Sequence, residues 1–138
     1  MIHTKFDIET AARTVIGEAR GEPVEGQEAI AWVIRHRAIA GRFGGPTLAH
    51  VCLRKAQFSS WNDGDPNREI IGGIGAHAVA LMQAIALVER VMYSHLSFDP
   101  VGGAMHYHHK DMDPKPGWAI GKPQVTTIGN HAFYANIS

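Results

Sequence analysis

Residues 4–22 read TKFDIETAARTVIGEARGE, and this stretch predicts one amphipathic helix followed by a sharp corner. Thr4 and Asp7 stand three residues apart, which is the spacing of a capping box at a helix N-terminus. Apolar residues then recur at helical spacing, at positions 8, 11, 12, 15, 16 and 19. At about 100° per residue, Glu18 lies at the edge of that apolar stripe. Gly21 is expected to end the helix, because glycine tolerates the left-handed backbone found there.

Further helices are expected downstream of this corner. Pro23 suits the first turn of a second helix that runs to about Ala40 and carries Arg37 on its apolar side. After a glycine-rich turn, Thr47 is expected to cap a short helix. The third long helix covers 76–93. Because it is apolar on nearly all sides, it is expected to lie at the centre of the core.

The last third of the chain changes to strand patterns. Residues 104–109 contain β-compatible side chains between turn signals. Residues 125–128 and 131–134 are separated by Gly-Asn alone, which predicts a two-residue hairpin. The fold class is therefore α+β, mostly helical, with a small antiparallel β-sheet toward the C-terminus. A length of 138 residues predicts a single domain over 1–138.

Composition excludes several classes of protein. The 13 basic and 13 acidic residues balance, which argues against a nucleic-acid binder or a protein that coats anionic membranes. No run approaches the roughly 18 apolar residues of a membrane span. One cysteine, Cys52, cannot form an internal disulfide and is expected to be buried. The N-terminus lacks a basic segment followed by an apolar run, so synthesis in the cytoplasm without a signal peptide is expected. Oligomeric state stays open.

Four carboxylates lie around the corner between the first and second predicted helices, from Glu18 to Glu28. Cleavage of a glycosidic bond needs a carboxyl that is protonated near neutral pH, and partial burial beside apolar groups favours that form. Glu18, at the rim of the apolar stripe, meets this requirement. Glu25 and Glu28 fall in the opening turns of the next helix and are expected to face water, while Glu22 could cap that helix or pair with Arg20. By periodicity alone, a surface acid remains the default interpretation of Glu18.

The tract 106-HYHHKDMD-113 supports a competing chemistry. On a strand, His106 and His108 share one face, and Asp111 or Asp113 could add an oxygen ligand for zinc. However, the spacing matches no closed zinc motif, and the same side chains suit the wall of a polar, aromatic groove. No metal site is therefore assigned.

Residues 55–69 predict an irregular loop, because they contain Asn-Asp-Gly-Asp-Pro-Asn. The amide, hydroxyl and ring of Gln57, Ser59 and Trp61 form a combination that suits a sugar: polar groups bond its hydroxyls and rings stack on its apolar face. The alternative is a loop that Phe58 and Trp61 pin to the core.

Several segments stand in a characteristic order: 13-RTVIGEARGEPVEGQEAIAWVIRHR-37, Val51-Cys52, Gln57-Phe58-Ser59, Asn62-Asp63-Gly64, 103-GAMHYHH-109, Trp118 and 128-IGNHAFY-134. Together they resemble the SleB-like cell wall hydrolase family, to which the spore-cortex-lytic enzymes belong. The resemblance covers about residues 8 to 135. It implies a single catalytic domain with a lysozyme-like, lytic-transglycosylase-related fold that cleaves peptidoglycan glycan strands.

The resemblance also implies site residues. The family's catalytic acid is the first Glu of its G/A-E-A-R-G-E motif, which is Glu18 in this sequence. No cofactor or metal is implied. The positions expected to line the glycan groove are Gln57, Ser59, His106, Tyr107, Trp118 and His131.

Several functions stay open at this point. If the C6 hydroxyl of the sugar attacks, the enzyme is a lytic transglycosylase; if water attacks, it is a muramidase, with Asp63 or Asp65 as the candidate second acid. A rival from another class is a zinc-dependent N-acetylmuramoyl-L-alanine amidase built on His106, His108 and Asp111. A third is a non-catalytic glycan-binding virion module.

Spore enzymes of this family carry a secretion signal and a separate peptidoglycan-binding domain, and neither is visible in the sequence. A catalytic domain without these parts suits a bacteriophage or prophage lysin, which other proteins would deliver to the cell wall. That origin is a hypothesis.

Overall fold

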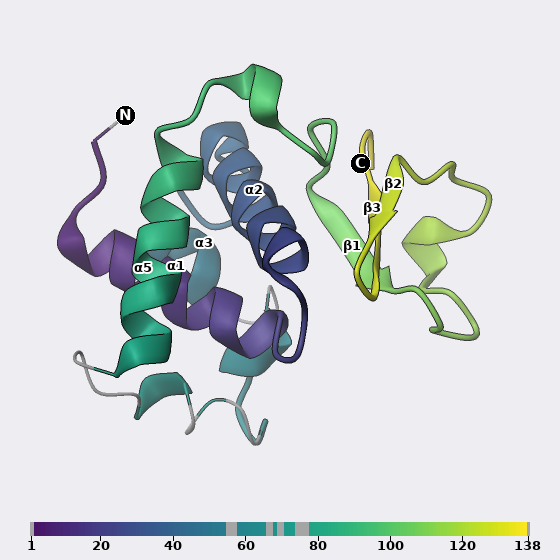
Figure 1. Cartoon of the computed structure of the whole chain (residues 1–138). Helices are drawn as coiled ribbons and strands as arrows, with labels where there is room; N and C mark the ends of the chain where they lie inside the picture. Colours follow the sequence, from purple (N-terminus) through teal and green to yellow (C-terminus); the bar gives the residue numbers. More distant parts are fainter. Residues whose placement is uncertain (1, 55–57, 66–67, 69–70, 74–77, 138) are drawn as a thin grey trace.

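The computed structural model describes residues 2–137 except 55–57, 66–67, 69–70 and 74–77. Helices form the first part of the chain and a small sheet forms the last (Figure 1). The helices are α1 (Lys5–Glu18), α2 (Val24–Ala40), α3 (Leu48–Leu53) and α5 (Val79–Met92), with short 3₁₀ helices η1 (Ser59–Trp61), η2 (Leu96–Phe98) and η3 (Gly117–Ala119). The strands are β1 (His106–His109), β2 (Thr126–Ile128) and β3 (His131–Tyr134). This arrangement confirms the α+β, mostly helical fold class.

Helix α1 begins at the predicted capping box, and it ends at Glu18, three residues before the expected stop at Gly21. The Thr4 hydroxyl accepts the Asp7 N–H at 3.0 Å, and the Asp7 carboxylate accepts the Thr4 N–H at 3.1 Å, which completes the capping box. The other oxygen of Asp7 accepts the N–H of Ala49, so the same cap ties α1 to α3. After the helix, Gly21 adopts a positive φ of 77°, which turns the chain toward α2.

The central helix is α2 rather than α5, which corrects the expectation that residues 76–93 would form the centre of the core. Every residue from Ala29 to Ile34 is buried, because α2 contacts α1, α3 and α5. Helix α5 begins at Val79 and leaves Val79 and Met82 more than half exposed. An apolar sequence does not say which faces of a helix will meet neighbours, since the topology of the chain decides that. Residues 76 and 77 lie outside the described residues.

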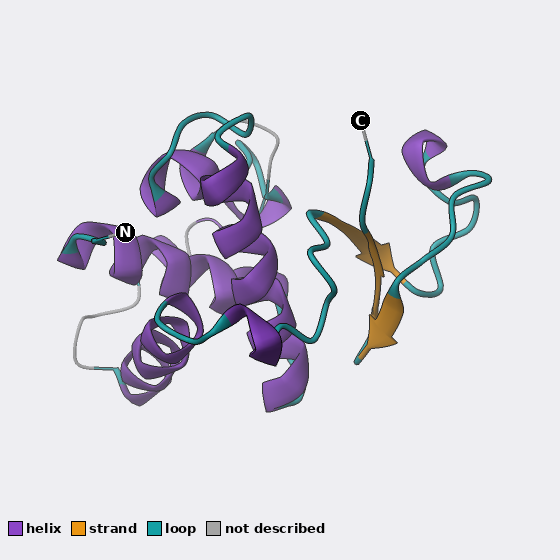
Figure 2. Ribbon diagram, turned by 90° about the horizontal axis from the view of Figure 1, so that it is seen from above, coloured by secondary structure: helices purple, strands orange, loops and turns teal. Residues whose placement is uncertain are grey.

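The three strands form one antiparallel sheet in the order β1-β3-β2. Tyr107 pairs with Phe133 across β1 and β3, and Ile128 pairs with His131 across the hairpin. The two-residue turn falls at the predicted Gly-Asn, where Gly129 has a φ of 58°. Figure 2 shows this sheet standing to one side of the helices. The expected acid, Glu18, ends α1, and the expected groove residue Tyr107 lies on β1, so the candidate site lies where the helices meet the sheet.

One main core holds the molecule together. Buried side chains from the helices pack with Val101, Ala104 and Phe133, so the sheet shares the helical core. A smaller cluster on the sheet joins Ala119, Ala132, Tyr134 and Ile137, with Trp118 against it. Among the described helices, none is both long enough and apolar enough to cross a bilayer.

Candidate functional site

Glu18 is the last residue of α1 and lies where the helices meet the sheet. One carboxylate oxygen, Oε1, accepts a hydrogen bond from the Tyr107 hydroxyl of β1 at 2.5 Å. The other, Oε2, accepts one from the backbone N–H of Ser60 in η1 at 3.0 Å. Three segments far apart in the sequence thus converge on one carboxylate. Both donors fix its orientation, which is the arrangement that a positioned acid or base needs.

Helix η1 can approach α1 closely because Gly17 of α1 has no side chain. A Cβ added at Gly17 would lie 2.6 Å from the Cβ of Ser60, closer than two carbon atoms can approach. The indole N–H of Trp61 donates to the Thr14 hydroxyl at 2.7 Å and secures η1 along the same helix. Phe58 is 1% exposed. The interpretation that Phe58 and Trp61 pin this loop to the core is confirmed.

Tyr107 is a donor that keeps its proton. Burial raises its phenol pKa well above the usual range, and the adjacent Glu18 charge and the hydrogen bond to Glu18 act in the same direction. Its ring meets the His131 ring edge-to-face, with centroids 5.0 Å apart at 79°. The phenol therefore keeps its proton throughout the neutral pH range.

Glu22 is buried at the same junction, and its main partner lies 108 residues away. Its Oε1 accepts the backbone N–H of Asn130 at 3.0 Å, in the turn between β2 and β3. The Nδ1 atom of His131 lies 3.3 Å from the same oxygen but is not aligned for a hydrogen bond. Burial lowers the pKa of His131, and the Glu22 charge opposes that shift. The sequence interpretation of Glu22, as a local cap or a partner of Arg20, missed this long-range contact.

His106 and His108 share one face of β1, as the alternation predicts, and both rings lie beside Trp118. The ring centroids are 5.3 Å and 5.9 Å from that of Trp118. Nδ1 of His108 lies 2.7 Å from the His109 carbonyl, and Nε2 lies 2.8 Å from the Tyr134 hydroxyl. Both nitrogens of His108 are thus already engaged. This aromatic surface lies on the face of β1 opposite to Tyr107, and its role as a groove wall stays a prediction.

The zinc hypothesis is not supported by the placement of these side chains. Asp111 is exposed, while His108 is buried against Tyr134. Within the described residues, no three His, Cys, Asp or Glu side chains are placed to share a metal ion.

His106 should make the folded state sensitive to acid. Burial and the nearby charges of Arg37 and Arg42 lower its pKa from 6.5 to about 4. Between those two pH values the unfolded chain binds a proton that the folded chain does not, so stability falls as the pH drops through that window. We expect His106→Gln to lose less unfolding free energy between pH 6.5 and pH 4 than wild type, measured by urea denaturation. His50→Gln, at an exposed histidine, is the control; equal pH slopes in His106→Gln and wild type would contradict this account.

Arg37 is a buried cation beneath the site. Its Nε–H donates to the Met105 carbonyl at 2.7 Å, and its guanidinium lies 4.9 Å from the Phe43 ring centroid and 4.8 Å from that of Phe58. Burial lowers the pKa of this guanidinium, and the Glu18 carboxylate opposes that shift. Periodicity placed Arg37 on the apolar side of its helix, but its link to the strand that carries Tyr107 could not be read from that spacing.

Not every expected groove residue can be placed. Gln57 lies outside the described residues. Ser59 begins η1, one residue before Ser60, and only its backbone is described. Asp63 is exposed and forms an ion pair with Arg68. The structure therefore brings Glu18, Tyr107 and His131 together where α1 meets the sheet, and it places His106 of β1 beside Trp118 of η3.

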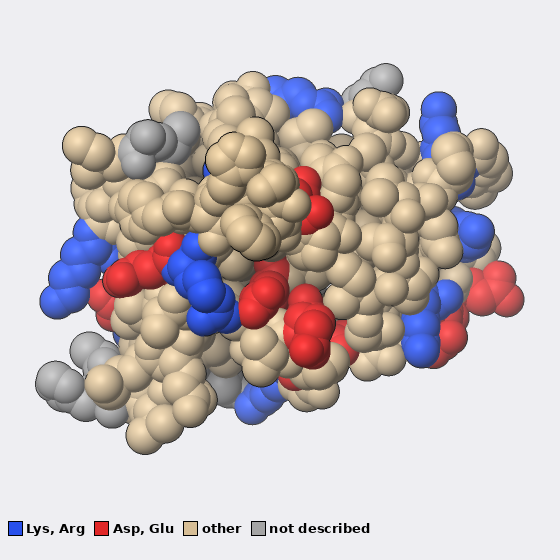
Figure 3. Space-filling view, turned by 45° about the horizontal axis from the view of Figure 1, so that its top comes forward, with Lys and Arg blue, Asp and Glu red and all other residues tan. Residues whose placement is uncertain are grey.

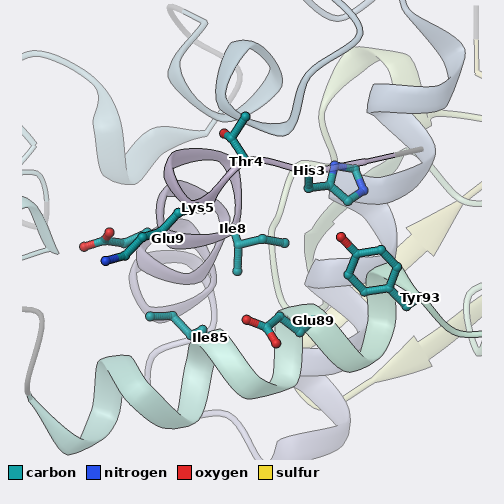
Figure 4. Close-up of a pocket in the computed structure, with 8 residues that line it drawn as sticks. All are labelled: His3, Thr4, Lys5, Ile8, Glu9, Ile85, Glu89 and Tyr93. Atoms are coloured by element: carbon teal, nitrogen blue, oxygen red, sulfur yellow. The ribbon is translucent and has the colours of Figure 1, made fainter.

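A separate hollow of about 470 Å³ lies at the opposite end of α1 (Figure 4). Glu9, on its wall, precedes Glu18 by nine residues, or about 13 Å along a helix axis. Its walls mix charges of both signs with apolar groups, from His3, Thr4, Lys5, Ile8, Glu9, Ile85, Glu89 and Tyr93. Among the predicted site residues that the structure describes, none lines it. On the face in Figure 3, acidic and basic side chains are likewise interspersed.

Comparison with known proteins identifies the family to which the chain is similar. A sequence model of the Cell Wall Hydrolase family matches residues 21–134, a span that begins three residues after Glu18. The spore cortex-lytic enzyme of Oceanobacillus iheyensis is 33% identical over 135 residues, or 95% of this chain and 42% of that protein. That of Bacillus subtilis is 33% identical over 127 residues, or 92% of this chain and 37% of that protein. The chain thus spans about two fifths of the length of these relatives.

The similar solved structures are likewise catalytic domains of spore cortex-lytic (SleB) proteins. The catalytic domain of the Bacillus cereus SleB protein superposes with a TM-score of 0.72 at 28% identity, covering 97% of this chain and 93% of that one. The catalytic domain of the germination-specific lytic transglycosylase SleB from Bacillus anthracis superposes with a TM-score of 0.68 at 27% identity, covering 96% of this chain and 97% of that one. The fold expected from the resemblance is confirmed.

Proposed function

The chain belongs to the Cell Wall Hydrolase family, and on that premise we propose that it degrades peptidoglycan by cleaving the β-1,4 bond between N-acetylmuramic acid and N-acetylglucosamine. We propose a lytic transglycosylase in which Glu18 is the only carboxyl that exchanges a proton with the substrate. The observation that carries this proposal is the Glu18 carboxylate held between the Tyr107 hydroxyl and the Ser60 N–H, where helices and sheet meet.

The reaction has two proton transfers. Protonated Glu18 first donates to the glycosidic oxygen, and the bond to C1 of N-acetylmuramic acid breaks as an oxocarbenium-like state develops. The resulting carboxylate then takes the proton from the C6 hydroxyl of the same sugar, whose oxygen bonds to C1 and closes a 1,6-anhydro ring. The acid is thereby returned to its protonated form. No water, metal or second carboxyl takes part.

The two hydrogen bonds at Glu18 suit these changes of protonation. The Ser60 N–H is a fixed donor, so Oε2 is the oxygen that remains an acceptor. Oε1 faces a phenol, which can donate to a carboxylate and accept from a carboxylic acid. Oε1 is therefore the oxygen that we assign to proton transfer. Because Tyr107 keeps its own proton, it orients this oxygen without competing for the transferred proton.

The aromatic surface of the sheet supports a glycan partner. Sugars present apolar faces that stack on rings and hydroxyls that bond to polar edges. His106 and Trp118 supply both kinds of contact on one face of β1, and His131 supplies them beside Tyr107 on the other face. We assign these residues, with Gln57 and Ser59, to the groove for peptidoglycan strands. Residues 1–138 would then act as one catalytic domain at the cell wall, with phage delivery as a hypothesis about origin.

Mass spectrometry of the fragments released from purified sacculi tests the reaction directly. We expect muropeptides that end in 1,6-anhydro-N-acetylmuramic acid, because the C6 hydroxyl rather than water attacks C1. Sacculi incubated without protein give the background of such ends. Reducing N-acetylmuramic acid ends would instead mean a muramidase and would direct attention to Asp63 and Asp65.

Two other outcomes would overturn the glycosidase proposal. Free stem peptides, lost on chelation and restored by zinc, would mean an amidase that uses His106 and His108. Binding to sacculi with no released fragment would mean a glycan-binding module that has no activity.

A further inference from the structure

Two carboxylates at the corner between α1 and α2, those of Glu18 and Glu22, contact the sheet. Glu18 reaches β1 through the Tyr107 hydroxyl, and Glu22 reaches the turn between β2 and β3 through Asn130. The two acids are four residues apart, and the left-handed Gly21 lies between them. A short segment of chain thus holds the sheet at two separate points.

The Glu22 carboxylate is built into the hairpin turn. Its side chain is 4% exposed, and burial of a carboxylate is costly unless its oxygens accept hydrogen bonds. Both oxygens are within reach of the Asn130 backbone N–H, at 3.0 Å and 3.3 Å, and Oε2 also accepts from the Asn130 side-chain amide at 3.4 Å. A Cβ added at Gly129 would lie 2.5 Å from Oε2, so only glycine allows the turn to approach this closely.

A chain of contacts leads from this turn to Glu18. His131 follows Asn130 directly, and its Nδ1 lies 3.3 Å from Oε1 of Glu22. Its ring stands edge-on to the Tyr107 ring, 5.0 Å away between centroids. Tyr107 then donates to Glu18 at 2.5 Å. A displacement of the hairpin would move His131 and the neighbouring Tyr107 ring, whose hydroxyl holds Glu18 in place.

We propose that Glu22 is a positioning residue for Glu18: by anchoring the Gly129–Asn130 turn and His131, it holds Tyr107 where its hydroxyl reaches the Glu18 carboxylate. The part of this proposal that concerns turnover rests on the function proposed above. A misplacement of about 1 Å at a reacting group can lower a rate on the order of 100-fold, so the loss of the anchor should appear in kcat. Substrate contacts elsewhere in the groove would keep KM nearly unchanged.

The tyrosine side chains offer a direct readout of this positioning. The chain has three tyrosines, so labelling with ¹³C at Cζ gives three resonances, and Tyr107→Phe identifies that of Tyr107. We expect Glu22→Ala to shift the Tyr107 resonance toward its position in Glu18→Gln, at a temperature where both variants are folded. Tyr93, in the helical part, should not shift. On purified glycan strands kcat should fall about 10- to 100-fold with KM within about twofold.

Matched variants separate positioning from stability. Glu22→Gln keeps an oxygen for the Asn130 N–H, so it should fall between wild type and Glu22→Ala, and it carries the test if Glu22→Ala does not fold. Glu25→Gln, an exposed acid three residues later, should behave as wild type. A lower melting temperature with the Tyr107 resonance and kcat unchanged would make Glu22 a structural residue only and overturn the proposal. If wild type releases no fragments, the proposed function fails, while the Tyr107 resonance still decides whether Glu22 positions it.

Discussion

Glu18→Gln is expected to lower the release of fragments from sacculi by about 100- to 10,000-fold, which is the contribution of a positioned general acid. Glutamine keeps the shape of the side chain, and its amide oxygen can still accept the Ser60 N–H. It cannot donate a proton to the glycosidic oxygen or take one from the C6 hydroxyl. The measurement is the loss of turbidity of purified sacculi together with the yield of muropeptides.

The fold should survive this change. Glu18 is partly exposed, and the lost charge-assisted bond to Tyr107 should lower the melting temperature by about 5 °C. Glu25→Gln removes a nearby carboxylate that faces water and should retain full activity. Full activity in Glu18→Gln would end the assignment of the acid to this residue. A large drop in melting temperature would mean that the loss of activity reports unfolding, and the rate would then be compared in Glu18→Asp.

Arg37→Ala is expected to cost about 3 kcal/mol of unfolding free energy, the largest stability change that we anticipate from a single polar side chain. The change removes a buried group that fills the space between Phe43 and Phe58. It also leaves the Met105 carbonyl without the donor that lies 2.7 Å away. For a chain of this size the melting temperature should fall by about 10 °C. Urea denaturation and a thermal melt measure both quantities.

Two comparison variants show which property of Arg37 matters. Arg54→Ala removes an exposed guanidinium that donates to the Arg42 carbonyl, and it should stay within about 0.5 kcal/mol of wild type. Arg37→Lys keeps the charge but loses the planar group that stacks on the rings, so it should be intermediate. Our account of Arg37 would be wrong if Arg37→Ala were as stable as wild type.

Local patterns predicted much of the fold. Thr4 and Asp7 form the capping box that their spacing indicates, and the hairpin turn lies at Gly129 and Asn130. These features depend on neighbours in the chain, so a short window of sequence contains what they need. Which helix is the most buried could not be predicted in this way. Helix α5 is more apolar than α2, yet α2 is the one enclosed, because enclosure depends on where the other helices lie.

The candidate site was likewise predictable only in part. Periodicity put Glu18 at the rim of a buried face, and the resemblance to a family made it the acid to test. Neither indicated that the Ser60 N–H would be its partner, because a backbone donor leaves no signature in the identity of its residue. Nor did they indicate that the Nε–H of Arg37 would donate to the carbonyl of Met105, the residue before β1.

The order of residues along the chain was enough to predict the helices, the hairpin and the family, and to select Glu18 as the acid to test. The partners of that acid, Tyr107 from β1 and the Ser60 amide from η1, follow from the tertiary fold, as does the contact of the buried Glu22 with a turn 108 residues further along the chain. The physical reason is that helix caps and turns are satisfied by residues a few positions apart. A buried carboxylate must instead find donors wherever the folded chain brings them, and that depends on the packing of every element at once.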